Sequence, residues 1–436
     1  MIENYRPVSV LKNISKIFEA VIYGRLSNFF MEKQFLSEKQ FGFRKERNTE
    51  MAVCDLIYKL LPAIQDKKIA LAVFLDYSAC FDTISRDILI DKLWKYGVRS
   101  KELDLMKSYL SGRKQYVSHN ESDSGIKQQN IGVIQGSRLG PLLYDIYSND
   151  FNSLCSQDEN ILYADDTCLV YVGNDLQELL DHVNNRLKII NDWCNANKLY
   201  LNRKKSEYMI VTSKIVNQNA DLYIGNDKLN RVDCFKYLGV QIDSSLKFHY
   251  HIENLKGKLS QACGMSYRIK KYLNFAAAKK LYYSTFYSVI QYCIGVYGGV
   301  MLCTQRCKQM ERSQDRMMKN LFSRFYPHSQ DLYKTIGILK LPDIYRLRAA
   351  TYMYRCLIKG ECPTIHNNLS ISYPQHSYET RNRNRLLEPF PRVETIRMNF
   401  QYQFVMVWNN VPDHIKAKRN LKMFKKSLIE YILGEY

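Results

Sequence analysis

The sequence has 436 residues, of which 46% are hydrophobic, so it is long enough for about two to three domains and too apolar for an intrinsically disordered protein. Its 12 cysteines are scattered, which favours reduced thiols in an intracellular protein, nuclear or cytoplasmic, over a disulfide framework. We find no long uncharged apolar run and no short apolar segment behind a basic N-terminus, so we expect neither a membrane span nor a secretory signal.

The net charge of +20 is concentrated in the second half of the chain. Residues 241–436 contain 31 Lys and Arg against 13 Asp and Glu, which gives +18 and leaves +2 for residues 1–240. The charge is accompanied by 33 Tyr and 19 Phe, and aromatic rings beside basic groups suit stacking on nucleobases. The pattern favours a polyanionic partner, with a merely soluble basic surface as the alternative.

Apolar periodicity and helix-ending residues predict the first elements. They are a helix over 7–31, an irregular basic segment over 34–48, a helix from a capping Asn48 to Ile64, a strand over Ile69–Leu75, a helix over Ile88–Tyr96 closed by Gly97, and a helix over 101–110.

The same signals continue along the chain. They predict a hairpin within 113–134, a helix opened by Gly136–Pro141, a hairpin at Asp165–Asp166, an amphipathic helix over Asp175–Lys198, and strands at 207–212, 221–224 and 235–242. Residues 245–325 and 330–436 are expected to be mainly helical, the latter with interruptions near Ser370–Glu379 and Pro389–Pro391. The region 69–242 therefore reads as α+β.

Three carboxylates stand at the ends of predicted strands. Asp76 ends the apolar run Ile69–Leu75, and Asp165 and Asp166 form the turn between two β-type runs. Such a set suits a divalent-metal site for phosphoryl transfer. The alternative is that these residues only cap turns, where Asp is favoured for its own hydrogen bonds.

Four further sites could contact a substrate, and each of them also has a purely structural or solvent-exposed interpretation. Phe81 is placed beside the Asp76 site or in the core, and Gln135–Gly136 lies at a helix N-terminus that offers free N–H groups or is simply capped. Arg44, in a Gly-containing basic loop, suits a phosphate clamp, and Lys205 follows in a basic run; for both, a solvated charge is the alternative.

A zinc site is a weaker hypothesis. Cysteines and one histidine in the second half could supply ligands but form no paired C-x₂-C set. They are Cys303, Cys307, Cys356, Cys362 and His366.

Together these segments resemble, in order, the motif series of reverse transcriptases of non-LTR (LINE-type, jockey-like) retrotransposons. The resembling segments are Asn4–Val10 with Ile14–Glu19, Gln40–Arg44 with Thr49–Glu50, Phe74–Thr83, Gly132–Leu143 with Tyr147–Asp150, Tyr163–Thr167, Trp193–Asn202 with Lys205–Glu207, and Lys236–Val240 with Asp243. The resemblance covers about residues 4–255 and includes no endonuclease domain.

The resemblance implies a right-hand polymerase of the α+β class. It implies fingers over 1–68, a palm with a ferredoxin-like antiparallel sheet over 69–243, a helical basic thumb over 244–325 and a helical basic region over 326–436. The implied activity is RNA-directed DNA polymerisation, with an RNA template, a DNA primer and dNTPs as partners and no membrane; it leaves the oligomeric state open.

The resemblance also implies a role for each candidate residue. Asp76, Asp165 and Asp166, with the backbone carbonyl of Tyr77, would bind two Mg²⁺ ions, or Mn²⁺ in their place. Phe81 would be the steric gate against ribonucleotides, and Lys205 would protonate pyrophosphate. The remaining substrate contacts would come from Arg44, Gln135 and Gly136.

Two departures from the family pattern accompany the match. The family usually has Lys-Ala where this chain has Ala79-Cys80, and Pro where it has Ile134. The alternative function is therefore a catalytically inactive or domesticated RNA-binding remnant. A third reading, a group II intron maturase or telomerase-like polymerase, fits the motifs less well.

Overall fold

The computed structural model describes residues 8–120, 122–155, 160–214, 221–361, 385–388, 391 and 393–436. The chain forms two compact units. The first comprises Met1–Arg47, Ile69–Ile210 and Val216–Val232, and the second Asn48–Lys68, Val211–Ile215 and Asp233–Tyr436. The predicted division into fingers, palm, thumb and C-terminal region stays a prediction, and the two units group the chain differently, because residues 48–68 join the second.

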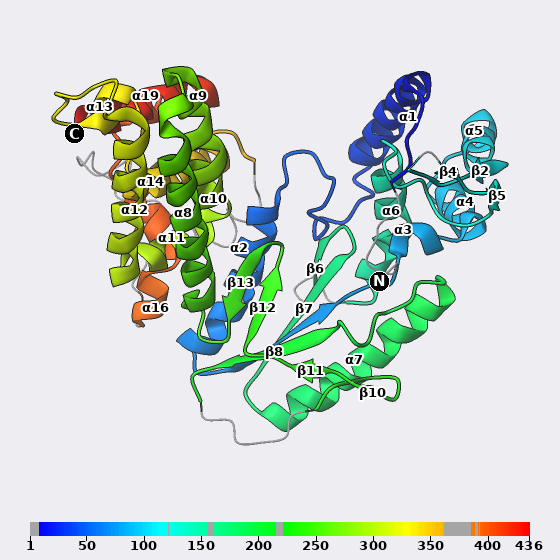
Figure 1. Ribbon diagram of the computed structural model, residues 1–436. Helices are drawn as coiled ribbons and strands as arrows, with labels where there is room; N and C mark the ends of the chain where they lie inside the picture. Colours follow the sequence, from blue (N-terminus) through cyan, green and yellow to red (C-terminus); the bar gives the residue numbers. More distant parts are fainter. Residues whose placement is uncertain are drawn as a thin grey trace. The chain divides into compact units, whose positions relative to one another are not determined.

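The first unit carries most of the β-structure (Figure 1). Its helices are α1 (Asn13–Glu32), α3 (Cys80–Thr83), α4 (Arg86–Lys95), α5 (Ser100–Leu110), α6 (Gly140–Ser148), the 3₁₀-helix η2 (Asn149–Ser153) and α7 (Leu176–Ala196). Its strands are β1 (Ile69–Leu75), β2 (Arg113–Gln115), β3 (Ser118–His119), β4 (Ser122–Asp123), β5 (Lys127–Gln129), β6 (Asn160–Tyr163), β7 (Asp166–Gly173), β8 (Glu207–Thr212), β9 (Tyr223–Ile224), β10 (Asp227–Lys228) and β11 (Asn230–Arg231).

The central sheet has five strands in the order β11-β8-β1-β7-β6. β7 runs antiparallel to both β1 and β6, and β11 runs parallel to β8. Between β1 and β6 the chain forms helices and two small two-stranded sheets, β2-β5 and β3-β4, and α7 connects β7 to β8. The four main strands therefore follow the ferredoxin-like β-α-β-β-α-β pattern. This confirms the predicted α+β fold class and its antiparallel sheet.

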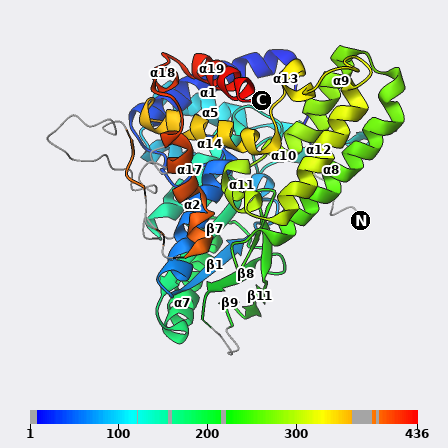
Figure 2. The same cartoon turned by 90° about the vertical axis from the view of Figure 1, so that its left-hand side faces the viewer.

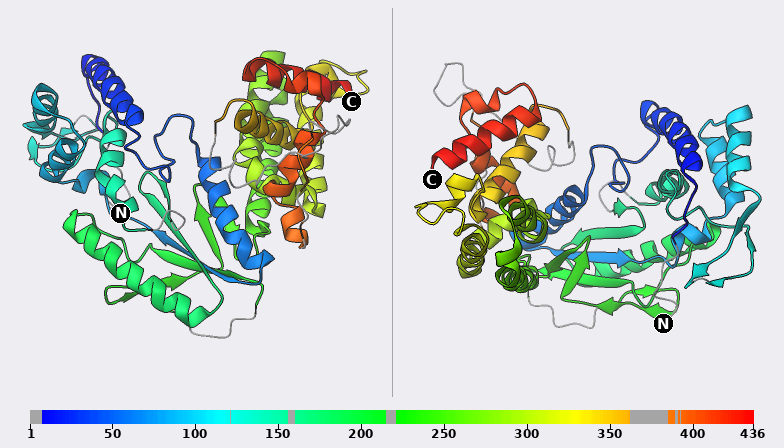
Figure 3. Two further views of the ribbon diagram at one scale, coloured as in Figure 1. Left: turned by 180° about the vertical axis from the view of Figure 1, so that it is seen from behind. Right: turned by 45° about the horizontal axis from the view of Figure 1, so that its top comes forward.

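Two elements show how the sequence builds this sheet. All seven residues of β1 are buried, as expected of a continuous apolar run that is covered on both faces. α7 begins where the Asp175 side chain accepts a hydrogen bond from the Glu178 amide. Its buried residues form an apolar stripe, and the helix packs against β7. The helix lies along the sheet (Figure 3, left).

α1 differs from its prediction. It begins at Asn13 rather than at residue 7, and most of the apolar side chains whose spacing predicted it are exposed. The exposed fractions are 70% for Ile14, 66% for Ile17, 65% for Phe18 and 53% for Val21. Periodicity therefore identified the helix correctly but did not identify a buried face.

The second unit is almost entirely helical (Figure 2). Its helices are α2 (Thr49–Gln65), α8 (His249–Ile269), the 3₁₀-helix η3 (Lys270–Tyr272), α9 (Phe275–Tyr282), the π-helix η4 (Tyr283–Tyr287), α10 (Ser288–Gln291), α11 (Ile294–Leu302), α12 (Gln305–Phe322), α13 (Leu332–Ile336), α14 (Leu341–Leu357), α16 (Glu394–Arg397), α17 (Phe400–Asn409), α18 (Asp413–Lys416) and α19 (Leu421–Gly434). Its strands are β12 (Cys234–Tyr237) and β13 (Val240–Asp243).

The long helices of this unit pack in pairs, α8 against α12 and α14 against both α17 and α19. The strand structure predicted over 235–242 is present, but it is divided into two strands by a turn that was not predicted. It is the hairpin β12–β13, because Leu238 and Gly239 adopt the left-handed backbone region with φ of 45° and 83°. The strand predicted at 221–224 is limited to Tyr223–Ile224.

Within the described residues, no single helix is both long and apolar enough to cross a membrane. One bent pair, Phe275–Gln291 with Ile294–Leu302, passes the length and composition test only when its two arms are joined across an 83° break. The predicted interruption at Ser370–Glu379 and the start of the first motif at Asn4–Pro7 lie outside the described residues.

Candidate active site

Two of the three predicted carboxylates meet at one end of the sheet because of strand register. Leu75, the last residue of β1, pairs with Thr167 of β7, so the next position along each strand sets Asp76 level with Asp166. Tyr163 pairs with Asp166 across the β6–β7 hairpin, which leaves Ala164 and Asp165 as the two turn residues. Asp166 is exposed, and Asp76 and Asp165 are half-buried.

The turn that carries Asp165 is held by a segment more than 120 residues earlier in the chain. The buried Gln40 side chain accepts hydrogen bonds from the amides of Gly42, at 2.8 Å, and Ala164, at 3.0 Å. Gly42 lies so close that an added Cβ would be 2.3 Å from the Ala164 nitrogen. Ala164 itself has a left-handed φ of 56°, so this contact stabilises a backbone conformation that is rare for alanine.

The backbone of Asp76 is fixed by the loop after α7. The Asp76 amide donates to Ser206 Oγ at 3.1 Å, and the Asp76 carbonyl accepts from the Asn202 amide at 2.8 Å. Tyr77 forms an antiparallel bridge with Leu201, and its ring is buried. Burial raises the pKa of Tyr77 well above its usual range, so this side chain stays neutral and serves packing.

A thiol lies against the turn carboxylate. The buried Cys80 hydrogen-bonds to Asp165, and burial first, then the charge of Asp165, raises the pKa of the thiol. Cys80 therefore remains a neutral thiol beside the carboxylate and adds no charge there.

The carboxylates are suited to a hard divalent cation by chemistry and position. Carboxylate oxygens at the rigid ends of adjacent strands are the ligands that Mg²⁺ prefers. The side chains do not already surround a cation position: among the residues that the structure describes, no three His, Cys, Asp or Glu converge as a metal-binding group. The carboxylates are therefore suitable ligands for a metal, but their side chains do not yet point toward one common position.

Phe81 lies between two other rings. It stacks on Tyr144 with a centroid distance of 4.9 Å and an interplanar angle of 24°, and Phe43 meets it edge-on at 6.4 Å. Phe81 remains half-buried, so part of the ring is accessible. Its orientation is thus set by α6 and by the segment near Gly42.

Gln135 is tied to the segment that carries Phe81. Its Nε2 donates to Asp82 Oδ2 at 2.7 Å, and burial raises the pKa of Asp82, opposed by this hydrogen bond. Gly136 has a φ of 96°. A Cβ added to this residue would lie 3.1 Å from the Ser9 carbonyl oxygen. The loop that carries Gln135 has a second contact with the Phe81 segment, since the Val133 amide donates to the Phe81 carbonyl at 2.8 Å.

Arg44 and Lys205 are positioned differently from these residues. Arg44 is half-buried, donates to the carbonyls of Leu36 and Ser37, and interacts with the buried Asp145, whose pKa is raised by burial and held down in part by Arg44. Lys205 is exposed on the loop that holds Asp76. The structure therefore sets Asp76 level with Asp166 beside the Asp165 turn and ties Gln135 to the segment that carries Phe81. Arg44 has internal partners.

The zinc hypothesis finds no support in the described residues. Cys307 and Cys356 are buried and Cys303 is exposed, and they are not part of any metal-binding group there. Cys362 and His366 lie outside the described residues.

Several residues that organise the site were not singled out from the sequence. They are Gln40 and Gly42 as holders of the turn, Cys80 and Ser206 as partners of the carboxylate segments, and Tyr144 as the platform for Phe81. Most of these contacts join positions over 60 residues apart, for which the local sequence carries no signal.

Comparisons with known proteins agree with this arrangement. Residues 2–242 match the family described as reverse transcriptase (RNA-dependent DNA polymerase). The chain is similar to the probable RNA-directed DNA polymerase from transposon BS of Drosophila melanogaster, with 33% identity over 265 residues that make up 58% of this chain and 28% of that protein. It is also similar to the RNA-directed DNA polymerase from mobile element jockey of Drosophila melanogaster, with 25% identity over 365 residues, 81% of this chain and 39% of that protein.

The chain therefore spans well under half the length of these relatives. Among solved structures, apo telomerase from Candida tropicalis is similar over 81% of this chain and 59% of that chain, with 12% identity and a TM-score of 0.42.

Proposed function

We propose that this chain, which belongs to the reverse transcriptase (RNA-dependent DNA polymerase) family, adds dNTPs to the 3′-hydroxyl of a DNA primer on an RNA template. The observation that carries the proposal is the register that sets Asp76 level with Asp166 beside the Asp165 turn. Phosphoryl transfer needs positioning and charge stabilisation more than covalent chemistry, and rigid strand ends provide the positioning.

Asp76, Asp165 and Asp166 would hold the divalent ions, two Mg²⁺ by family analogy. When bound, such ions lower the pKa of the attacking hydroxyl and neutralise the triphosphate charge. The chain's own contribution is to fix the ligands: Ser206 and Asn202 hold the Asp76 backbone, and Gln40 holds the turn.

The aromatic group around Phe81 would define the sugar side of the nucleotide site. Because Tyr144 and Phe43 fix the Phe81 ring, the ring would not move aside for the 2′-hydroxyl of a ribonucleotide. Gln135, held by Asp82, would contact the incoming nucleotide and the template. For Arg44, Lys205 and Gly136 we retain the roles of triphosphate contact, proton donor and close backbone approach.

The test is primer extension on an RNA template with Mg²⁺ and dNTPs. Wild-type protein should extend the primer, and Asp165→Ala should abolish extension. Asp192→Ala removes the same side chain at an exposed position of α7 and should extend as the wild type does. Wild-type protein that binds RNA and Mg²⁺ yet adds no nucleotide would contradict the proposal.

The runner-up is a catalytically inactive RNA-binding remnant. The observations that favour it are the two departures from the family pattern, Ala79-Cys80 and Ile134, which lie next to the candidate site residues Phe81 and Gln135. The same assay separates the two functions, because a remnant would bind RNA equally well in the wild type and in Asp165→Ala and extend in neither.

A further inference from the structure

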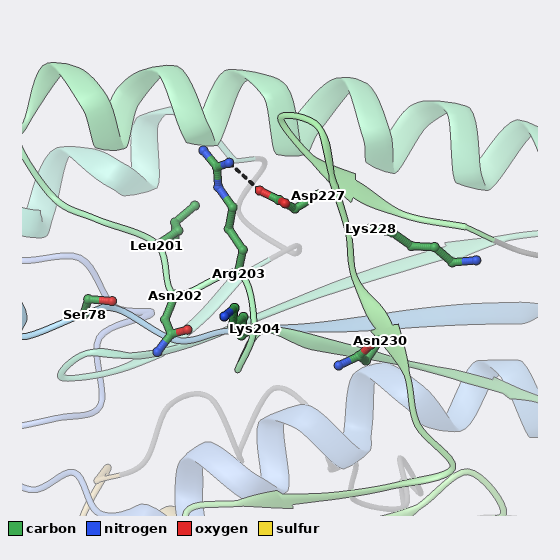
Figure 4. Close-up of a pocket in the computed structure, with 8 residues that line it drawn as sticks. All are labelled: Ser78, Leu201, Asn202, Arg203, Lys204, Asp227, Lys228 and Asn230. Atoms are coloured by element: carbon green, nitrogen blue, oxygen red, sulfur yellow. Dashed lines mark hydrogen bonds and ion pairs between the residues drawn. The ribbon is translucent and has the colours of Figure 1, made fainter. Parts of the chain in front are cut away.

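A polar pocket lies beside the strand end that carries Asp76, in the same unit. Its cavity has a volume of about 480 Å³. The lining residues come from the segment after β1, the loop before β8 and the β10–β11 segment (Figure 4): Ser78, Leu201, Asn202, Arg203, Lys204, Asp227, Lys228 and Asn230. We propose that this pocket binds a backbone phosphate of single-stranded nucleic acid, an inference that rests on the proposed function.

One arginine in the pocket is pre-oriented. Arg203 Nη1 forms an ion pair with Asp227 Oδ2 at 2.5 Å, and the guanidinium carbon and both terminal nitrogens lie 3.6 Å from the position of an added Cβ on Gly225. Asp227 takes one terminal nitrogen, which leaves most of the guanidinium donors for another acceptor. A planar fork held in this way suits a phosphate group.

The neighbouring cation has no such partner. Lys204 is exposed and forms no ion pair with any residue in the described part of the chain, whereas Lys228 pairs with Asp221 at 2.8 Å. Asn202, Asn230 and Ser78 add neutral donors around it. A pocket with a free ammonium, an oriented guanidinium and amide donors has the chemistry of an anion site.

The spread of the cations favours a nucleic-acid backbone over a compact anion. In Figure 4 the Arg203 side chain turns toward Asp227, and Lys228 extends away from the other lining residues. Cations that diverge in this way suit a strand with successive phosphates, whereas free pyrophosphate would need them to converge on one point.

The pocket is coupled to the catalytic strand through main-chain bonds. The Asn202 amide donates to the Asp76 carbonyl, and the Ser78 amide donates to the Tyr200 carbonyl, both at 2.8 Å. On the other side of Arg203 and Lys204, Ser206 Oγ accepts from the Asp76 amide at 3.1 Å. The loop that carries Arg203 and Lys204 is therefore bracketed by contacts to the backbone around Asp76. A seated phosphate would restrain this loop, and with it the segment that ends β1.

The experiment measures binding of a single-stranded RNA by fluorescence anisotropy over a salt series, in the full-length Asp165→Ala background with EDTA. Lys204→Ala should weaken binding about threefold to tenfold at low salt and lower the salt slope by about one. Lys188→Ala removes an equal charge from an exposed position of α7 and should change neither quantity.

A second variant separates a phosphate site from bulk charge. Arg203→Ala/Asp227→Ala leaves the net charge unchanged, so a nonspecific effect predicts unchanged affinity, whereas the proposed site predicts a loss similar to that of Lys204→Ala. Unchanged binding in either variant would overturn the site. Loss of pyrophosphate binding in Lys204→Ala with unchanged RNA binding would also overturn it.

The RNA-binding result does not depend on nucleotide addition, because the Asp165→Ala protein in EDTA does not extend primers. A wild-type protein that fails to extend primers would contradict the proposed function, while the RNA-binding series would still decide whether the pocket holds a phosphate.

Discussion

Gly42 packs so closely against the Asp165 turn that the candidate site has no room for a larger side chain at this position. A Cβ at residue 42 would meet the Ala164 nitrogen at 2.3 Å, and backbone atoms cannot move aside as a flexible side chain can. Gly42→Ala should therefore lower the free energy of unfolding by about 1–3 kcal/mol, the range for overpacking, and should slow nucleotide addition by displacing the turn.

The matched control is Gly24→Ala, in the middle of α1, where nothing lies within 4 Å of an added Cβ. This change should be neutral or should stabilise the fold by up to about 1 kcal/mol, because alanine favours helix more than glycine does. Equal stability and activity of the Gly42 variant and the control would show that residue 42 does not support the turn.

Phe81 allows a test of sugar selectivity. Phe81→Ala should admit ribonucleotides and reduce the preference for dNTPs over rNTPs by about tenfold or more, because the ring that would meet the 2′-hydroxyl is gone. Single-nucleotide incorporation with matched dNTP and rNTP measures the ratio. Trp94→Ala, which removes an exposed ring elsewhere in the unit, should leave it unchanged. An unaltered ratio in Phe81→Ala would remove the gating role.

At the scale of single residues, the sequence motifs predicted the positions of the carboxylates along the strands but not the residues that support them. Asp76 follows β1 and Asp165 lies in the β6–β7 turn as predicted, whereas Asp166, predicted in that turn, is the first residue of β7. Gln40 and Ser206 could not be singled out, because their roles depend on contacts across 124 and 130 residues.

At the scale of elements, a buried ion pair joins α2 to α14 within the second unit. Glu50 is 2% exposed; it accepts from Arg348 Nε at 2.8 Å, from the Gly295 amide at 2.6 Å and from the Tyr352 hydroxyl at 3.1 Å. Glu50→Gln leaves the Arg348 charge without its carboxylate and should cost about 3–5 kcal/mol of unfolding free energy.

Denaturant unfolding measures this cost, with Glu430→Gln as the control. Glu430 forms an exposed pair with Lys426, so its loss should change stability by no more than about 0.5 kcal/mol. Similar small effects at both positions would mean that the Glu50 network does not hold the helices together.

The second unit also contains a pH-sensitive contact between α8 and its neighbours. Burial first, and then the nearby charge of Lys258, lowers the pKa of His251 to about 4. The ring packs edge-on against Tyr297, and its Nε2 is buried without a hydrogen-bond partner among the described residues.

Because the unfolded imidazole titrates near about 6.5, the unfolded chain takes up a proton that the folded one excludes. The contribution of His251 is fully present above about pH 6.5 and is lost as the pH falls toward about 4, with a total on the order of 3 kcal/mol. His251→Gln should flatten the stability profile in this window, measured by urea unfolding at several pH values. An unchanged profile would show that His251 does not carry this dependence.

Comparing the elements with their predictions shows which sequence signals were sufficient to predict local structure. The predicted cap at Asn48 is present as a side-chain hydrogen bond from the Met51 amide, because capping is a local interaction, and Asp175, predicted only as the start of its helix, caps α7 in the same way through the Glu178 amide. The exposed apolar face of α1 and the β12–β13 hairpin were missed for different reasons. Periodicity does not say whether a face is covered, and the two left-handed residues at the hairpin turn interrupt what reads as one strand.

At the scale of the whole molecule, charge is the property that the sequence predicts most directly. Residues 241–436 carry +18, and neutralising phosphates with these groups releases counterions from the nucleic acid. We expect RNA affinity to fall by at least about tenfold between about 50 mM and 200 mM salt, measured by anisotropy. A flat response would indicate that the charge serves solubility alone.

We propose that Asp76, Asp165 and Asp166 form one phosphoryl-transfer site on an RNA-templated polymerase. Single-turnover addition of one dNTP to a primer annealed on RNA tests it most directly, with Asp76→Asn, Asp165→Asn and Asp166→Asn compared with Asp192→Asn. We predict a rate loss of about a thousandfold or more in each of the three variants, with RNA binding retained and Asp192→Asn unaffected. Wild-type rates in any of the three, or no addition by the wild-type protein, would contradict the claim.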